Sequence, residues 1–396
     1  MASLLSLVKR EMENKGMVQI PLLVEKLCVS VGGHVFNLTN LDNRRFYHAG
    51  SLENFRSHVV IMAPSGFSKT TYIKFFLDPH HGILSHCYQI FPTTVRSTFS
   101  SESWIGTIYQ KGKKIEASQG LFSRFKRGII GADEFMRLKD LAEAESKPGR
   151  KHTNEEVYLL SALEGETATK DLSFGTIEET DIGTTIWPGM RLTKLDTTSG
   201  LLRRFIFHII FPTPQLAKEF KQAIRNKQIS KPISPVVKEQ VKETIEEMKQ
   251  VASEMKEIDY SEIERYLNGS MKVSHVEERI YKRIAVGYAF ASGTLPDVVM
   301  DDTLEAIFRH EQYCRYIIRD DPEKEAIYQV ALATKDEPLT KEELEAFMFK
   351  YYYMNRYRFH RLFHLLTAEG LIQVRNNHVH AVERNWNQNR FLLFPR

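Results

Sequence analysis

The chain has 396 residues, of which 42% are hydrophobic and 26% charged, as is typical of a soluble globular protein with two or three domains. The net charge of +4 permits contact with nucleic acid but does not indicate it alone. Three widely spaced cysteines argue against a disulfide framework or a metal site. No apolar stretch reaches the ~20 residues that cross a bilayer, and the start of the chain becomes charged too early for a secretory signal. We therefore expect an intracellular, cytoplasmic protein without membrane contact.

The first half of the chain predicts strands that alternate with helices. An amphipathic helix and a polar stretch suggest a small N-terminal subdomain over residues 1–54. The expected elements that follow are a strand–loop–helix unit at 58–77, a hairpin around Lys111–Lys114, an apolar strand at 128–135, a helix at 153–164, a hairpin leading into a strand at 167–187, and a strand at 201–211. This alternation predicts an α/β core with a mainly parallel sheet over residues 55–213.

The second half of the chain is predicted to be largely helical. Residues 214–268 are highly charged, and we interpret them as a solvated connector that precedes two or three helices at 275–318, giving a connector and lid at 214–320. The last segment, 321–396, is predicted to contain three helices followed by two short strands, the order of a winged-helix domain.

The strand–loop–helix unit contains a degenerate phosphate-binding motif. Lys69 and Thr70 stand as in G-x-x-x-x-G-K-[ST], while Ala63 and Ser68 replace both signature glycines. Backbone N–H groups of such a loop wrap phosphates, the lysine reaches the β- and γ-phosphates, and the threonine binds magnesium. The residues expected to bind ATP are Ala63, Pro64, Ser65, Gly66, Phe67, Ser68, Lys69, Thr70 and Thr71. The alternatives are a chance Ser-Lys-Thr at a helix start and a loop that no longer hydrolyses ATP.

A second acidic element follows about sixty residues later. Ile129, Ile130 and Ala132 lead into Asp133 and Glu134, and we expect this strand to lie beside the first. Asp133 would then bind Mg²⁺ together with Thr70, and Glu134 would polarise the attacking water as general base. The alternative is an acidic pair that caps the next helix.

The order of the remaining features resembles a known family. The segment SGLLRRFIFHIIF at 199–211 places Arg204 before an apolar run, as in the Ser-Arg-Phe element of the AAA+ core of MCM-type replicative helicases. Residues 160–189 look like the pre-sensor hairpin and sensor strand of that core, and residues 278–313 resemble its helical lid. The same order is similar to the helicase-like ATPases of plasmids, proviruses and archaeal viruses.

The resemblance implies roles for several further residues. Arg204 would be an arginine finger that completes the ATP site of a neighbouring subunit, with a surface charge as the alternative. Arg191 stands where a sensor Asn is expected, with Thr185 as another candidate for positioning the water. Arg279 or Arg283 would be a second sensor that touches the γ-phosphate; for either residue the alternative is a charge on the helix surface. The missing loop glycines and the absence of the large MCM N-terminal domain are departures from the family.

Two regions are candidates for DNA contact. If residues 167–187 form a hairpin, Lys170 lies near its tip, where it could grip a nucleic-acid backbone in a ring channel; an ordinary edge hairpin is the alternative. In the C-terminal segment, the expected DNA ligands lie near the start of the third helix and at the wing tip: Arg356, Arg358, Arg361 and Arg375. A winged helix also serves in protein–protein docking.

The sequence thus predicts an α/β P-loop AAA+ ATPase core with a helical lid, a short N-terminal subdomain and a C-terminal winged helix. Its expected function is that of an ATP-dependent DNA motor, a replicative or replication-initiation helicase acting as a ring, most simply a hexamer. The expected cofactors are ATP and Mg²⁺. The alternatives are an origin-binding initiator or DNA-binding switch without translocation, and a non-hydrolysing structural protein.

Overall fold

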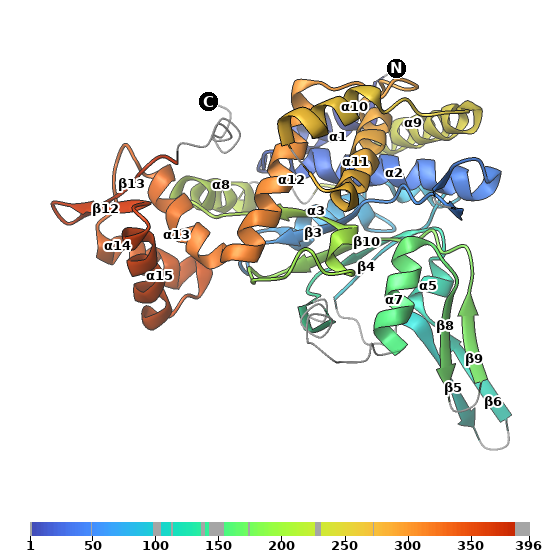
Figure 1. The fold of residues 1–396 in the computed structure, drawn as a ribbon, viewed down its shortest axis with the longest axis horizontal. Coiled ribbons are helices and arrows are strands. Elements are labelled where there is room, and N and C mark those ends of the chain that lie inside the picture. Colours follow the sequence, from blue (N-terminus) through green and yellow to red (C-terminus); the bar gives the residue numbers. More distant parts are fainter. Residues whose placement is uncertain are drawn as a thin grey trace.

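The protein is a mixed α/β structure built on a central parallel sheet (Figure 1). The computed structural model describes residues 2–48, 50–97, 104–111, 114–135, 139–141, 154–172, 175–225, 231–271 and 273–384. Among these residues, no helix combines the length and apolar character needed to cross a membrane.

The central sheet contains five strands in the order β11-β3-β10-β7-β4. Every neighbouring pair in it is parallel, which confirms the predicted parallel core. The strands are β3 (His58–Met62), β4 (Thr93–Arg96), β7 (Ile129–Ala132), β10 (Thr185–Met190) and β11 (Phe205–Ile209). The expectation that the acidic strand lies beside the phosphate-loop strand was wrong, because β10 is inserted between β7 and β3.

Both faces of the sheet are buried, which explains why its strands are continuously apolar. In β3, Val59 and Ile61 point into one hydrophobic cluster while Val60 and Met62 point into the other. The helices that contribute to the first cluster include α1 (Leu4–Asn14), α2 (Leu23–Asn43), α3 (Lys69–Leu77), α9 (Pro235–Glu254) and α11 (His275–Ser292). The second cluster is covered by α5 (Leu121–Arg124), α7 (Asn154–Glu164) and the end of α12 (Asp302–Asp320).

The N-terminal helices belong to this main core. All residues of the 21-residue helix α2 up to Leu41 are buried, and α2 packs against both α9 and α11. Its backbone touches that of α11, since a Cβ at Gly32 would lie 2.3 Å from the Gly287 carbonyl oxygen. Residues 1–54 therefore share one core with the sheet, and α9 is not a purely solvated connector, because one face of it is buried.

Short elements complete the body of the molecule. They are β1 (Tyr47–His48), β2 (Ser51–Leu52), η1 (Ser85–Cys87), η2 (Leu202–Arg204), α8 (Pro214–Arg225), α10 (Ser261–Tyr266) and η3 (Leu267–Met271).

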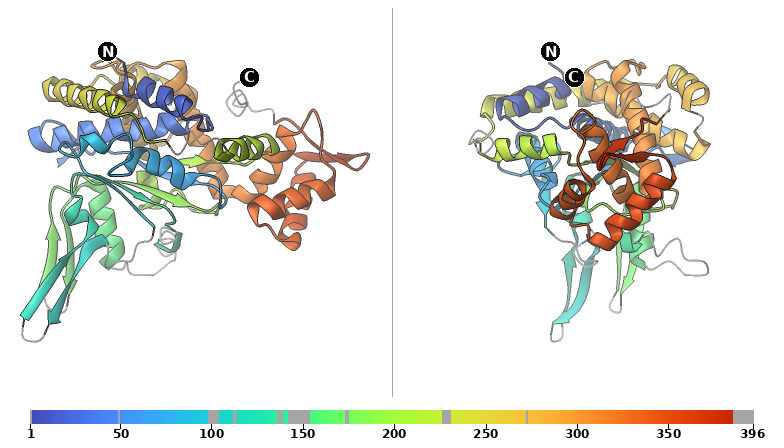
Figure 2. Two further views of the ribbon diagram at one scale, coloured as in Figure 1. Left: turned by 180° about the vertical axis from the view of Figure 1, so that it is seen from behind. Right: turned by 90° about the vertical axis from the view of Figure 1, so that its left-hand side faces the viewer.

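Two antiparallel hairpins project side by side from the body (Figures 1 and 2). They are formed by β5 (Gly106–Lys111) with β6 (Lys114–Gln119), and by β8 (Ala168–Leu172) with β9 (Gly175–Glu179). Both hairpins lie where the sequence predicts them.

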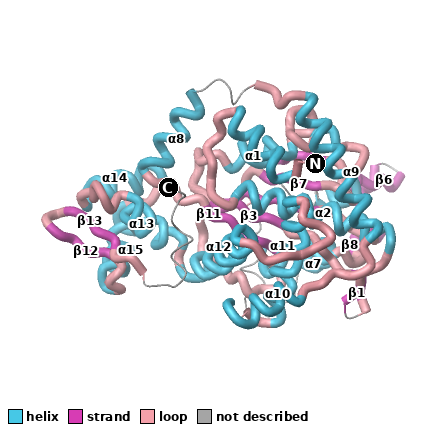
Figure 3. Tube along the Cα trace, turned by 90° about the horizontal axis from the view of Figure 1, so that it is seen from above, coloured by secondary structure: helices cyan, strands magenta, loops and turns pink. Residues whose placement is uncertain are grey.

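The C-terminal segment forms a module with its own hydrophobic cluster at one end of the molecule, next to α8 and α12 (Figure 3). Its elements are α13 (Pro322–Ala333), α14 (Lys341–Tyr352), α15 (Arg356–Ala368), β12 (Ile372–Arg375) and β13 (His378–Ala381). The predicted order of three helices and two strands is present. Tyr351 and Tyr352 belong to α14, so the link to α15 is shorter than expected.

A buried charge cluster ties α2, β11 and α12 together. Glu311 is fully buried; its carboxylate lies 2.9 Å from Lys26 Nζ and 3.0 Å from Arg315 Nε. The same carboxylate accepts a hydrogen bond from the Phe207 backbone N–H at 2.8 Å. Glu311 is thus the counter-charge that two buried cations require.

Glu311→Gln is expected to lower the free energy of unfolding by about 3–5 kcal/mol, because it leaves Lys26 and Arg315 buried without a counter-charge. Urea denaturation followed by circular dichroism would measure the change. Glu305→Gln on the same helix removes only a partly exposed pair with Arg309 and should cost less than about 1 kcal/mol. Equal losses in the two variants would contradict a special role for Glu311.

Three histidines, His34, His58 and His208, are buried, and burial lowers the pKa of each below its ordinary value. For His34 the pKa falls to about 3, chiefly through burial and also through the nearby Arg56 charge. Its ring contacts the Thr185 hydroxyl at 2.9 Å and the Arg127 carbonyl at 3.2 Å.

Acid is therefore expected to destabilise the fold. Between pH 6.5 and about 3 the unfolded chain binds a proton at His34 that the folded chain rejects, so stability is full above pH 6.5 and falls as pH drops. At pH 5 the loss amounts to about 2 kcal/mol for such a histidine. Urea unfolding at pH 7.5 and pH 5 would measure it. His34→Gln should reduce the pH dependence by the part that His34 contributes, while the exposed His364→Gln should not change it. Stability that is constant over this range would contradict the prediction.

Candidate nucleotide-binding site

The loop between β3 and α3 occupies residues 63–68 at the carboxyl end of the sheet. Gly66 has φ +85° and Ser68 has φ +56°, both in the left-handed region. Ser68 occupies the position of the second signature glycine, so the backbone conformation that favours glycine is kept without the glycine. The strain for a serine is about 1 kcal/mol.

Lys69 is folded over this loop. Its Nζ donates hydrogen bonds to the carbonyl oxygens of Ala63 at 2.8 Å and Pro64 at 3.1 Å. Burial lowers the pKa of Lys69, while the nearby carboxylates of Glu134 and Asp133 oppose that shift. The ammonium group is thus held at the loop by weak neutral acceptors, which a phosphate oxygen would outcompete.

The predicted magnesium ligands lie together. The Thr70 hydroxyl at the start of α3 donates a hydrogen bond to the carboxylate of Asp133, which follows β7. A hydroxyl and a carboxylate are hard oxygen donors that suit Mg²⁺. In the described part of the chain, no group of three or more His, Cys, Asp or Glu side chains could hold a metal alone. A magnesium ion at this pair would therefore take its other ligands from phosphate and water.

Glu134 is paired with Arg191, the residue that directly follows β10. Arg191 Nε lies 2.8 Å from Glu134 Oε1, and both side chains are about half exposed. Because β10 lies between β3 and β7, its end brings Arg191 between the loop and the acidic pair. Thr185 is not part of this group, since it lies at the opposite end of β10 and contacts His34.

Phe67 links the loop to the C-terminal half of the chain, a contact that sequence reasoning missed. Its ring centroid lies 5.7 Å from that of Phe220 in α8 and 5.9 Å from that of Tyr351 in α14. The sequence feature that could have indicated this contact is an aromatic residue next to Gly66 in a loop of small residues.

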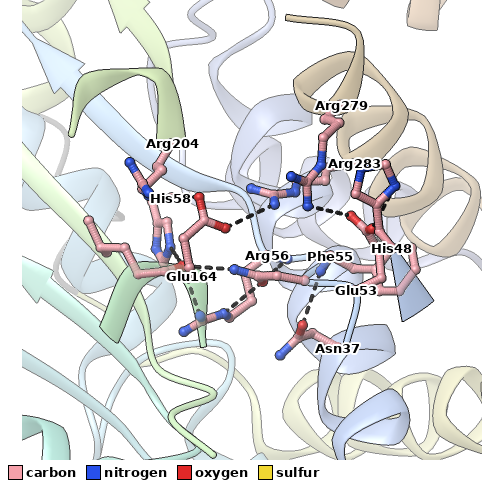
Figure 4. A network of polar contacts seen from close by, with 12 residues as sticks. Asn37, His48, Glu53, Phe55, Arg56, His58, Glu164, Arg204, Arg279 and Arg283 are labelled. Atoms are coloured by element: carbon pink, nitrogen blue, oxygen red, sulfur yellow. Dashed lines mark hydrogen bonds and ion pairs between the residues drawn. The ribbon is translucent and has the colours of Figure 1, made fainter. Parts of the chain in front are cut away.

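The predicted finger and second sensor gather around a separate cavity of about 780 Å³ (Figure 4). Glu164 lies 2.7 Å from Arg204 Nε and 3.3 Å from an Arg283 guanidinium nitrogen, and Arg279 lies 3.3 Å from Glu53. None of the cavity's lining residues belongs to the loop or to the acidic pair. The expected contact of Arg279 or Arg283 with the γ-phosphate stays a prediction, and in this chain both line a cavity apart from the loop.

The candidate DNA ligands differ in their surroundings. Arg358 is held by Asp321 at 2.7 Å and Glu323 at 2.8 Å, so in this structure it fastens α15 to the start of α13. The Arg356 side chain is 82% exposed, and Arg361 and Arg375 are also exposed. Lys170 lies in β8 opposite Ile177, and its side chain is outside the described part of the structure.

Comparison with known proteins does not assign the chain to a family. No protein-family model matches the chain, and no curated protein sequence matches it.

Proposed function

We propose that this protein is a Mg-ATP-hydrolysing ATPase of AAA+ type that moves or remodels DNA as a ring. The observation that carries the proposal is the grouping of Lys69, Thr70, Asp133, Glu134 and Arg191 at the carboxyl ends of three adjacent parallel strands. In open α/β sheets, ligands bind at this edge.

Each of these residues has a chemical task in the proposed site. The backbone N–H groups of the loop and the Lys69 ammonium would hold the phosphates, and Thr70 with Asp133 would hold Mg²⁺, which neutralises phosphate charge when bound. Glu134 would orient and deprotonate the attacking water. Arg191, now paired with Glu134, would hold that carboxylate in place until substrate phosphate competes for the guanidinium.

The position of the other arginines favours a site shared between subunits. Arg204, Arg279 and Arg283 line one cavity that the loop does not reach. A fixed guanidinium stabilises charge on a transferring phosphoryl group only by direct contact. These arginines would therefore act on nucleotide bound to a neighbouring copy, as expected for a closed ring with head-to-tail interfaces.

Two surfaces would contact DNA. We propose that the C-terminal module is a winged helix that uses Arg356, Arg361 and Arg375, and that Lys170 in the β8–β9 hairpin tracks the backbone.

A second function, an ATP-dependent DNA-binding switch without translocation, is favoured by the Phe67 contacts with α8 and α14. They connect the loop to the module that carries the proposed DNA ligands. A nucleotide that reshapes the loop would in this way shift the module.

Strand displacement on a forked DNA with ATP, together with electron microscopy of the same sample, tests the first function. We expect rings, DNA-stimulated hydrolysis and displaced strand. DNA binding that depends on ATP without displacement would select the switch. Nucleotide binding without hydrolysis in any condition would leave only a structural role.

A further inference from the structure

Glu164 stands at a junction between the arginine-lined cavity and a hairpin. It is the last residue of α7, and β8 begins four residues later at Ala168. Its carboxylate contacts Arg204 at 2.7 Å and Arg283 at 3.3 Å, and its side chain is 20% exposed (Figure 4). Burial opposes ionisation, but Arg283, Arg204 and Arg279 together lower the pKa of Glu164, so it is a carboxylate at neutral pH.

The end of α7 is otherwise held through its main chain. The buried Arg56 donates to the carbonyl oxygens of Ala162 at 3.1 Å and Leu163 at 2.8 Å, and Asn54 Nδ2 donates to Leu163 at 2.7 Å. These bonds cap the helix, and beyond its end the Glu166 N–H donates to the Ser161 carbonyl oxygen at 2.9 Å, but none of these bonds involves the arginines that line the cavity. The side chain of Glu164 thus supplies the contact between the hairpin root and the arginines.

The cavity is lined by more positively charged hydrogen-bond donors than carboxylates. Among its lining residues, Arg45, Arg203, Arg204, Lys256, Arg279, Lys282 and Arg283 outnumber the acids Glu53, Glu164, Glu257 and Glu278. Among the residues that the structure describes, the buried Nε atoms of Arg279 and Arg283 have no hydrogen-bond partner, and the Arg283 side chain is only 8% exposed. Buried guanidinium donors of this kind suit a multiply charged oxyanion such as phosphate.

We propose that Glu164 is a positioning residue that a phosphate group displaces from Arg204 and Arg283, and that its release loosens the root of the β8–β9 hairpin. Phosphate carries more charge than the carboxylate and competes for the same donors, so the two cannot both hold them. The proposal rests on the proposed function in one respect: the phosphate is that of the nucleotide on the neighbouring copy. A carboxylate that holds the finger and the hairpin together would couple ATP binding to the DNA-contacting hairpin.

The test uses inorganic phosphate and the full-length Lys69→Ala protein, so that the loop does not contribute to binding. In this background we compare Glu164→Gln with Glu166→Gln, an equal change of charge at an exposed position two residues away. Calorimetry measures phosphate affinity. Hydrogen exchange of the amides in residues 165–172 and 175–179 measures the hairpin.

With Glu164 intact, phosphate should accelerate exchange in the hairpin root. Glu164→Gln should show fast exchange without phosphate and should bind phosphate about tenfold more tightly, the value of one competing charge-assisted contact. Glu166→Gln should behave like its parent. Simple damage to the fold would not tighten phosphate binding, and Arg283→Gln, which keeps Glu164, should weaken it.

Two results would overturn the proposal. One is a phosphate affinity of Glu164→Gln that equals that of its parent, and the other is a rate of hydrogen exchange in the hairpin that phosphate does not change in any variant. ATP added to the unmodified protein should reproduce the phosphate effect, and ATP added to Lys69→Ala should not. If ATP had the same effect on both proteins, the displacing phosphate would not come from the nucleotide bound by a neighbouring copy. The proposed ATPase function fails separately, if Lys69→Ala leaves nucleotide binding unchanged.

Discussion

Lys69→Ala is expected to reduce ATP binding and hydrolysis by at least about 100-fold. The ammonium group is already positioned at the loop by the Ala63 and Pro64 carbonyls, so little rearrangement is needed for it to meet a phosphate. Loss of one or two charge-assisted contacts removes about 3 kcal/mol, which corresponds to about two powers of ten. Fluorescent-nucleotide titration and phosphate release would measure the two effects.

The matched control for this prediction is Lys74→Ala. Lys74 lies on the same helix, α3, and is exposed, so its replacement removes an equal charge outside the site. It should leave both quantities within a factor of about two, as for a surface substitution. If Lys69→Ala bound ATP as well as the parent protein, the loop would not be a phosphate site, and the first alternative, a chance Ser-Lys-Thr, would stand.

Arg204→Ala is expected to reduce hydrolysis about 10³-fold or more when subunits are assembled, while leaving nucleotide binding by each chain nearly intact. In one chain Arg204 lies with Glu164 and not at the loop, so its effect would arise only at an interface. Glu134→Gln should also abolish hydrolysis, but from the other side of that interface.

Mixing the two inactive variants separates a shared site from a site within one chain. An Arg204→Ala subunit keeps Glu134, and a Glu134→Gln neighbour supplies the missing arginine. At equal ratio, about a quarter of the interfaces in a randomly mixed ring combine both intact groups. Hydrolysis should therefore reappear in the mixture. Activity that stays at the level of the separate variants at all ratios would contradict an arginine supplied by a neighbour. A mixture with Arg319→Ala in place of Arg204→Ala is the control for loss of an exposed positive charge.

Local sequence patterns predicted the elements of the fold well. Uninterrupted apolar runs such as 58–62 and 205–209 form buried parallel strands, and both hairpins lie where alternation and turn residues indicated them. Strand order was harder, because the place of β10 between β3 and β7 depends on crossovers between distant segments. No local sequence pattern indicates this strand order.

The candidate site was predictable where residues follow strand ends at the same edge of the sheet. Thr70 and Asp133 are 63 residues apart but meet as expected, because Thr70 follows β3 through the loop and Asp133 follows β7 directly. The ion pairs of Arg358 were not predictable, because its partners, Asp321 and Glu323, lie at the start of another helix. The contacts of Glu164 were not predictable either. An acidic residue at the end of a helix is common, and the arginines around it come from distant parts of the sequence.

The backbone contact between α2 and α11 limits how this molecule can move. A Cβ at Gly287 would lie 2.3 Å from the Val29 carbonyl oxygen, so the two helices leave no room between them to slide or separate without breaking close packing. Helix α11 carries Arg279 and Arg283, and α2 is fixed to β11 through Lys26. Helix α11 is therefore closely packed onto the body that holds the sheet. In the proposed function we expect movement in the parts that project from this body, which are the paired hairpins and the C-terminal module.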